Sequence, residues 1–241
     1  MSEMIKTPVA SSVGTRKSIK EFFNVQNICT LSMMSALSFI LYQFVKLPAF
    51  PFFPSFLQIN FSSIPILLAT FMLGLPGGLT TVLIRSLLAL PFGDGNAYIG
   101  ALADFIMGIA IVIPTWLVYS RLQTRKGALM AMGLATVVGT IVAMLVNRFF
   151  LIPLYVEVFF GGDWDILLGM VRPLYTNITI DNFYSIYLWA AVLPFNLMWL
   201  IPCSLVVFFI YKPLEHLLKN IQNRQKNVNK DEIYGNMDAD A

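Results

Sequence analysis

The sequence has few charged residues for its length. Only 12% of its 241 residues are charged, while 57% are hydrophobic. Soluble domains carry about 25% charged residues. With a mean hydropathy of +0.73, most of the chain must have lipid as its solvent. The sequence therefore predicts an all-α integral membrane protein.

Cysteine and histidine are also scarce. Cys29 and Cys203 both lie in apolar segments, so we interpret them as core residues and expect neither a disulfide nor a metal site. The only histidine, His216, lies in the polar C-terminal part, so no His pair for catalysis forms within the membrane. The glycine-rich stretch 74–78 lacks the lysine of a phosphate-binding loop. These absences predict a protein that is not an enzyme and needs no cofactor.

Six apolar segments follow one another along the chain. A helix that crosses a bilayer needs about 20 apolar residues. Two of the six are shorter than this: one has Pro65 near its start, and the other is bounded by Pro76 and Pro91. The segments are 25–45, 62–74, 76–90, 97–119, 128–156 and 183–211. We see no internal repeat, which disfavours the secondary-transporter folds that are built from repeats.

The sequence predicts three parts along the chain. They are a cytoplasmic N-terminal arm (1–24), a six-helix membrane domain (25–211) and a largely disordered cytoplasmic tail (212–241). Between segments five and six, residues 160–182 predict an extramembrane loop. The stretch 48–65 is rich in proline and aromatic residues and is too broken to form a helix.

The basic residues gather on one side of the predicted topology. With six segments, both termini and the loop between segments four and five share one face. That face holds 12 of the 16 basic residues, whereas the opposite loops hold mostly acidic residues. The positive-inside rule then predicts a multi-pass protein of the bacterial cell membrane with both termini in the cytoplasm. The basic residues form no single stripe with aromatic residues, so nucleic acid is not an expected partner.

A few polar side chains lie at predicted membrane depth. Charged groups there cost about 2.5–3.5 kcal/mol and usually face a partner or a cavity. Arg85 and Asp104 allow two interpretations, a structural pair or part of a binding site. Asn147 and Asn196 favour a site, because an amide has donors and an acceptor in one plane that suit the edge of a heterocycle.

Two further features each allow two interpretations. The aromatic stretch, with Phe56, Leu57 and Phe61, is either an interfacial aromatic belt or a cover that stacks on a flat ligand. Ser32 and Ala36 are small residues spaced four apart, which allows close approach of another helix but is common in membrane helices.

The chain resembles the S components of energy-coupling factor transporters, and among them the riboflavin-binding type. The runs NRFFLIPLY and PFNL, the latter followed by YKPL, carry most of the resemblance. The matching segments in family order are 57–78, 99–114, 124–155 and 192–214. The resemblance implies six helices, an outward-facing vitamin site, and a complex with one transmembrane coupling subunit and two ATPases.

The resemblance also assigns roles to residues. It implies that Asn147 and Asn196 hold the vitamin, that the aromatic loop before segment two closes over it, and that Ser32 and Ala36 meet the coupling subunit. We include Trp199, Asp104 and Arg85 among the candidate substrate-binding residues.

The sequence departs from the riboflavin-type pattern at several positions. The pattern has a lysine where Trp199 stands, an asparagine where Asp104 stands and a glutamate where Ala101 stands; an acidic residue is usual where Asn60 and Ser63 stand. Trp199 removes a cation near the expected pocket and adds a stacking surface. Riboflavin is the expected substrate. The alternatives are another vitamin, such as cobalamin or a second heterocycle, and a stand-alone secondary carrier.

Overall fold

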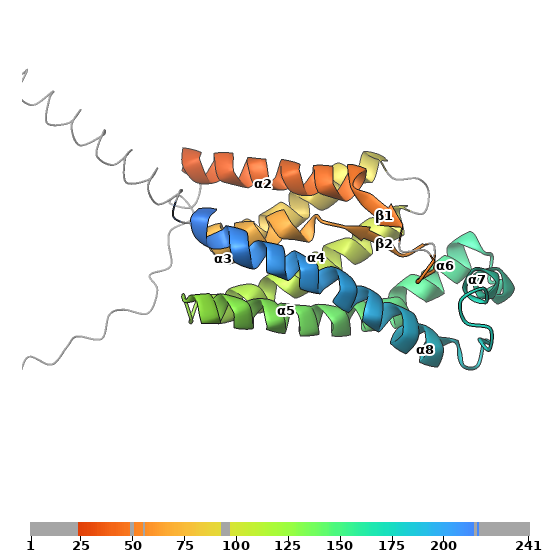
Figure 1. Ribbon diagram of the computed structural model, residues 1–241. Helices are drawn as coiled ribbons and strands as arrows, with labels where there is room; N and C mark the ends of the chain where they lie inside the picture. Colours follow the sequence, from red (N-terminus) through yellow and green to blue (C-terminus); the bar gives the residue numbers. More distant parts are fainter. Residues whose placement is uncertain (1–23, 49–50, 55, 93–96, 215, 217–241) are drawn as a thin grey trace, which may run out of the picture.

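The protein is a bundle of long helices that lie side by side (Figure 1). The computed structural model describes residues 24–48, 51–54, 56–92, 97–214 and 216. The elements of the first half are α2 (Val25–Phe44), α3 (Ser63–Ala89) and α4 (Ala97–Tyr119). In the described part of the chain, five helices are long and apolar enough to cross a membrane. The predicted helical membrane architecture is confirmed.

The second of these helices, α3, folds back on itself. Gly74 has φ 74° and ψ −163°, values outside the helical range and unfavourable for residues with a Cβ. Arg85 Nη1 donates to Ser62 Oγ at 3.2 Å, although 23 residues of straight helix would separate the two by about 35 Å. The chain therefore reverses at Gly74, and the predicted segments 62–74 and 76–90 are the two limbs of a hairpin.

Glycines allow these two limbs to pack closely. A Cβ added at Gly78 would lie 2.3 Å from Thr70 Oγ1 on the first limb and 2.8 Å from Val112 Cγ1 on α4. Such distances are too short for any side chain at position 78. The Gly-rich stretch is thus a packing element of the hairpin.

The two last helices each contain a wider turn. Helix α5 (Arg125–Val146) continues through the π-helical η2 (Asn147–Leu151) into α6 (Ile152–Phe159). The final helix runs from Phe183 to Leu214, and it begins as α8 (Phe183–Ile186) and the π-helical η3 (Tyr187–Val192).

Pro194 provides a physical reason for the wide turn η3. Proline has no N–H to bond to the carbonyl four residues earlier, and its ring crowds that carbonyl. The carbonyl of Ala190, four residues before Pro194, accepts a hydrogen bond from the Tyr175 hydroxyl at 3.0 Å instead.

Among the described residues, the short strands and the short helix α7 (Trp164–Val171) lie at one end of the bundle (Figure 1). The short strands β1 (Lys46–Pro48) and β2 (Gln58–Asn60) pair antiparallel, with Lys46 opposite Asn60. The predicted loop 160–182 contains the helix α7. Leu167, Leu168 and Val171 form the buried face of this helix. That the segment lies outside the membrane stays a prediction.

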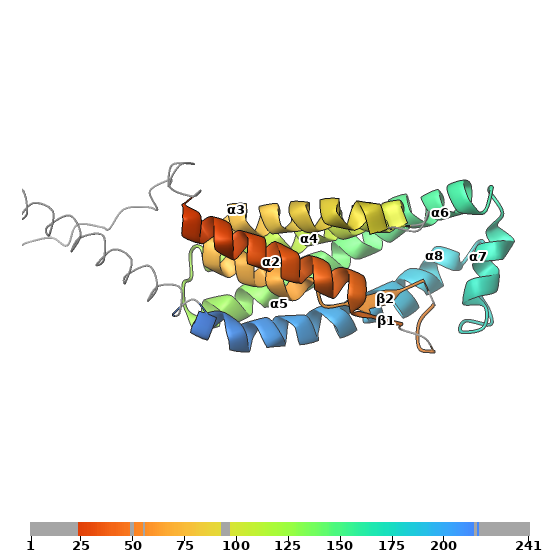
Figure 2. The ribbon, with the colours of Figure 1, turned by 90° about the horizontal axis from the view of Figure 1, so that it is seen from above.

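The opposite end holds the beginning of α2, the α4–α5 connection and the end of the last helix (Figures 1 and 2). Six segments, with the two limbs of α3 counted separately, should bring the start of the first helix and the end of the last helix to the same end, as observed. Which side of the membrane this end faces stays a prediction. Most of the N-terminal arm and of the tail lie outside the described residues.

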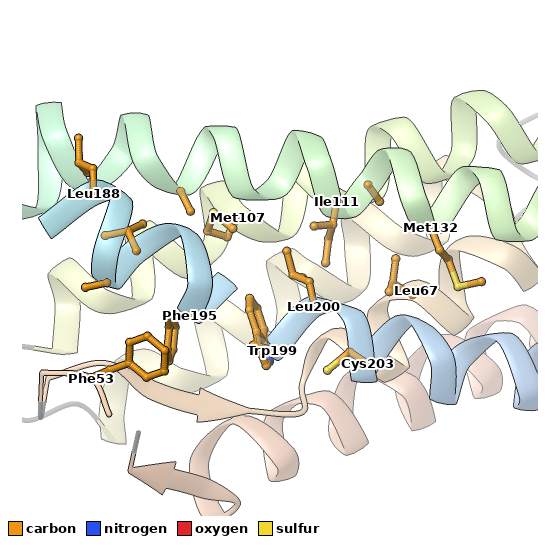
Figure 3. Close-up of a cluster of buried hydrophobic side chains, with 14 of the residues drawn as sticks. Phe53, Leu67, Met107, Ile111, Met132, Leu188, Phe195, Trp199, Leu200 and Cys203 are labelled. Atoms are coloured by element: carbon orange, nitrogen blue, oxygen red, sulfur yellow. The ribbon is translucent and has the colours of Figure 1, made fainter. Parts of the chain in front are cut away.

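The core lies along the bundle axis. Figure 3 shows Leu67 of α3, Met107 and Ile111 of α4, Met132 of α5 and Leu200 of the last helix converging on it. Large apolar side chains on the outside, such as Phe149 and Phe209, are about 70% exposed in the isolated chain, which suits contact with lipid.

The two cysteines lie in different surroundings. Cys203 is fully buried in the core, as predicted. Cys29 is exposed on α2, so its predicted core position was wrong. An apolar segment in lipid is apolar on every face, and the sequence therefore did not reveal which face of α2 is covered.

Candidate functional site

A cavity of about 440 Å³ opens among the helices at the end that carries β1 and β2. Small-molecule sites usually measure about 300–1,000 Å³. Residues from the strands, α2, α4, η2, α6 and the last helix line it. They include Tyr42, Lys46, Phe56, Leu57, Gln58, Asn60, Ala103, Asp104, Met107, Asn147, Ile152, Tyr155, Tyr187, Phe195, Asn196 and Trp199.

Two buried asparagines mark one wall. Asn147 begins η2, where its Nδ2 donates to the Ala143 carbonyl at 2.9 Å and its Oδ1 accepts from the Tyr187 hydroxyl at 2.9 Å. On the last helix, Asn196 Nδ2 donates to the Val192 carbonyl at 2.8 Å. An amide nitrogen carries two protons. Each of these amides therefore keeps a donor for a ligand after making its helix bond.

Trp199 joins this wall to the strand β2. Its indole N–H donates to the main-chain carbonyl of Asn60. The Asn60 Oδ1 accepts from the Ser62 main-chain N–H at 3.2 Å and from the Ser62 hydroxyl at 2.6 Å. Because the indole N–H is already bonded, Trp199 offers the cavity an aromatic surface and no free donor. Its side chain also fixes the position of β2.

A second wall is acidic. Asp104 of α4 lines the cavity beside Tyr42, Lys46 and Tyr155. The Arg85 guanidinium and, more weakly, the Lys46 ammonium interact electrostatically with the Asp104 carboxyl, and Tyr42 hydrogen-bonds to it. The cavity therefore places an amide wall and an acidic wall around one space.

Arg85 lies behind the acidic wall. Its Nη2 donates to the Asp104 main-chain carbonyl at 2.9 Å, and its guanidinium stacks over the Tyr42 ring at 4.9 Å. Arg85 is buried and does not line the cavity. These contacts favour the interpretation of Arg85 as a structural residue that joins α3 to α4.

Aromatic side chains cover the cavity from the side of the strands. Phe56 lies 6.1 Å from the Tyr187 ring, and Phe53 packs edge-on against Phe195 at 5.7 Å. Figure 3 shows Phe53 and Phe195 together near the strands, with Trp199 further along the same helix. The cavity thus has aromatic surfaces and buried amide edges, a combination that suits a flat polar ring.

Most of the predicted substrate-binding residues converge on this cavity. Its lining contains Asn147, Asn196, Trp199, Phe56, Leu57 and Asp104. Phe61 instead packs partly buried against the hydrophobic core, and Arg85 lies behind the wall. Sequence reasoning missed Tyr42, Tyr155 and Tyr187, because a tyrosine in an apolar segment resembles any other aromatic core residue.

The remaining predicted residues lie elsewhere. Ser32 and Ala36 are exposed on one face of α2 in the isolated chain, away from the cavity lining. Among the described residues, no group of three or more His, Cys, Asp or Glu side chains could hold a metal ion.

Known proteins with similar sequences share one family. The family model of the ECF transporter substrate-specific component matches residues 26–211. The riboflavin transporter RibU of Staphylococcus aureus is 32% identical over 196 residues, which cover 81% of this chain and 94% of that protein. The riboflavin transporter RibU of Streptococcus thermophilus is 27% identical over 223 residues, covering 85% and 96% of the two chains.

A solved structure agrees with these relatives. A structure of the S component of a bacterial ECF transporter superimposes with a TM-score of 0.60 at 30% identity, over 80% of this chain and 96% of that one. The family match covers the five membrane helices except for Val25 and residues 212–214, and it includes every residue that lines the cavity. The chain belongs to the family of substrate-specific components of ECF transporters.

Proposed function

We propose that this chain is the riboflavin-binding subunit of an ECF importer. The observation that carries the proposal is the pair of buried amides, Asn147 and Asn196, beside aromatic surfaces in one cavity. Relatives at 26–32% identity are named riboflavin transporters, which favours this vitamin over other heterocycles.

The chemistry of the cavity supports a flat heterocycle. The isoalloxazine ring of riboflavin has carbonyl and N–H groups along one edge and two apolar faces. The amides can pair with that edge, and Phe56 and Trp199 can cover the faces. A site built for such hydrogen bonds rejects ligands that leave its polar groups unpaired.

We further propose that the cavity faces outward and the termini face the cytoplasm. A transmembrane coupling subunit and two ATPases would then be the partners that move the vitamin inward. The exposed face of α2 with Ser32 and Ala36 supports a close helix contact there. The acidic loops at the cavity end and the basic residues at the other end support this orientation.

The absorption spectrum of the purified chain tests the substrate. A bound flavin gives a yellow protein, and titration of the ligand-free protein should show saturable, equimolar quenching of riboflavin fluorescence. A red protein would indicate a corrinoid and contradict the proposal. Ion-driven uptake by this chain alone in vesicles would instead favour a secondary carrier.

Replacing Ala36 with leucine tests the partner surface. We expect Ala36→Leu to abolish riboflavin uptake by the full complex in cells, because a bulky side chain prevents close helix approach. Riboflavin binding by the purified variant should stay unchanged, since Ala36 lies outside the cavity. Leu37→Ala, at an exposed neighbouring position of α2, provides a control with a smaller side chain. Equal loss of binding and uptake in Ala36→Leu would point to misfolding and refute the interface.

A further inference from the structure

Arg148 is a charged residue of a membrane helix that the vitamin cavity does not use. It follows Asn147 in η2, but it is exposed on the outside of the bundle and is not part of the cavity lining. In the described part of the chain, the only ion pair joins Arg172 to Asp165, so no carboxylate there neutralises Arg148. A charged group on a membrane helix is costly unless it has a partner or reaches the membrane surface.

The guanidinium of Arg148 is held between aromatic rings. Its Cζ lies 4.7 Å from the centroid of the Tyr184 ring and 5.6 Å from that of the Phe149 ring. Tyr184 packs edge-on against Trp164 of α7, with the ring centroids 6.1 Å apart. Stacking occupies a face of the planar guanidinium and leaves N–H groups at its edge. The side chain is therefore oriented to bind an anion.

Helix lengths place Arg148 at the level of the lipid headgroups. Arg148 lies 23 residues after Arg125, the first residue of α5, which is about 35 Å of helix. The hydrocarbon core of a bilayer is about 30 Å thick, and about 40–45 Å with the headgroups. Trp189 and Lys212 on the last helix are also 23 residues apart, and Trp189 is 66% exposed, as is usual for tryptophan at a membrane surface. Arg148 and Trp189 thus both lie in one headgroup layer when Arg125 and Lys212 lie in the other.

An exposed apolar strip runs from Arg148 toward the middle of the membrane. Ile141, Leu145 and Phe149 are spaced four apart and are 52%, 50% and 70% exposed. Residues three or four apart share a face of a helix, so Arg148 continues the line that Ile141 and Leu145 begin. One face of the helix therefore carries a cation at headgroup level and apolar side chains below it. That pattern matches a molecule with an anionic head and an acyl chain, whereas a free phosphate would not contact the strip.

We propose that Arg148 binds the phosphate of an anionic phospholipid in the leaflet at the cavity end, and that an acyl chain of this lipid lies along Ile141 and Leu145. A guanidinium can form two parallel hydrogen bonds to a phosphate, and bonds between charged groups are about twice as strong as neutral ones. A zwitterionic headgroup carries its own cation beside the phosphate and therefore binds more weakly. The bound lipid would hold the bundle at the depth where η2 begins, with α6 and α7 projecting beyond the membrane.

Photocrosslinking of a lipid to the full chain tests this site. The protein is placed in phosphatidylcholine vesicles that contain a small fraction of phosphatidylglycerol with a photoreactive diazirine on one acyl chain. After irradiation, mass spectrometry locates the labelled residues. We expect label on the exposed face of residues 141–149, and at least about fivefold less label there in Arg148→Gln. Arg148→Lys keeps the charge but loses the planar fork, so its labelling should be intermediate.

Competing lipids and matched variants separate the outcomes. Unlabelled phosphatidylglycerol should remove the label, and additional phosphatidylcholine at the same concentration should not. Arg172→Gln makes the same change at a cation that already has a carboxylate partner, and it should leave the labelling unchanged. If Arg148→Gln does not fold, Tyr184→Leu removes the ring that orients the guanidinium and should lower the labelling about twofold or more.

Three results would overturn the inference. The first is parent-like labelling of residues 141–149 in a folded Arg148→Gln, or in Tyr184→Leu where Arg148→Gln does not fold. The second is equal competition by the two lipids, which would make this face an ordinary lipid contact. The third is loss of the label with inorganic phosphate at an ionic strength matched by chloride, which would indicate a site for a free anion.

Discussion

The two ends of the bundle use the same helices but pack them differently. At the end where α2 begins and the last helix ends, α5 buries Ala128, Ala131 and Ala135 against its neighbours, and the α3 hairpin closes through Gly78. Toward the other end the same α5 widens into the π-helical η2, and Asn147 faces a cavity. Small residues at helical spacing close the space between helices, whereas wide turns and large polar side chains keep it open.

The largest expected effect concerns which end of the bundle faces the cytoplasm. We predict that the closely packed end faces the cytoplasm. A cysteine introduced at Gln123, in the α4–α5 connection, should react with a membrane-impermeant reagent only after the membrane is opened. A cysteine at Asp181 should react in intact cells. In both variants Cys29 and Cys203 are first replaced by serine. Labelling of both sites from outside would contradict the predicted orientation.

Overpacking of the closed end should be the next largest effect. Gly78→Val places a side chain where a Cβ already lies 2.3 Å from Thr70 Oγ1. We expect a loss of about 3 kcal/mol or more, or no folded protein, measured by thermal unfolding in detergent. Gly133→Val is the matched control, because a Cβ there meets nothing within 4 Å. Equal stability of the two variants would mean that the hairpin does not close as described.

Changes at the open end should affect binding and leave folding largely intact. Asn147→Ala or Asn196→Ala removes an amide that we expect to bond to the ligand. A buried hydrogen bond left unmade costs about 1–3 kcal/mol, so riboflavin should bind roughly five- to a hundredfold more weakly. Titration by flavin fluorescence measures this. Cys203→Ser, in the core outside the cavity lining, should change affinity far less. Parent-like binding by both asparagine variants would show that the ligand site is wrong.

The smallest expected effect concerns Trp199. Trp199→Phe keeps an aromatic surface but removes the donor to the Asn60 carbonyl. One net hydrogen bond is worth about 0.5–1.5 kcal/mol, which predicts about two- to tenfold weaker riboflavin binding. Trp189→Phe on the exposed side of the same helix is the control and should have no effect. If Trp199→Phe binds like the parent, the tie between the last helix and β2 does not contribute to the site.

Several elements could be predicted from the sequence because their signals are local. Helix boundaries near 25–45 and 97–119 follow from apolar length, and the break near residue 74 follows from glycine and proline. The strand pairing of β1 with β2 was not predictable, since each strand has three residues and the pairing joins positions 46 and 60. Helix α7 was missed because charged residues flank a short apolar run.

By itself, the sequence determined that lipid surrounds most of the chain and that the fold is helical. It also determined that the number of membrane crossings is even and which polar residues lie at membrane depth. These depend on composition and spacing, because an unpaired backbone or charge in lipid costs several kcal/mol wherever it occurs. Only the tertiary structure decided that Arg85 lies behind Asp104, that Tyr187 bonds to Asn147, and that Cys29 is exposed. In a membrane helix every face is apolar, so the buried face is set by which neighbour packs against it.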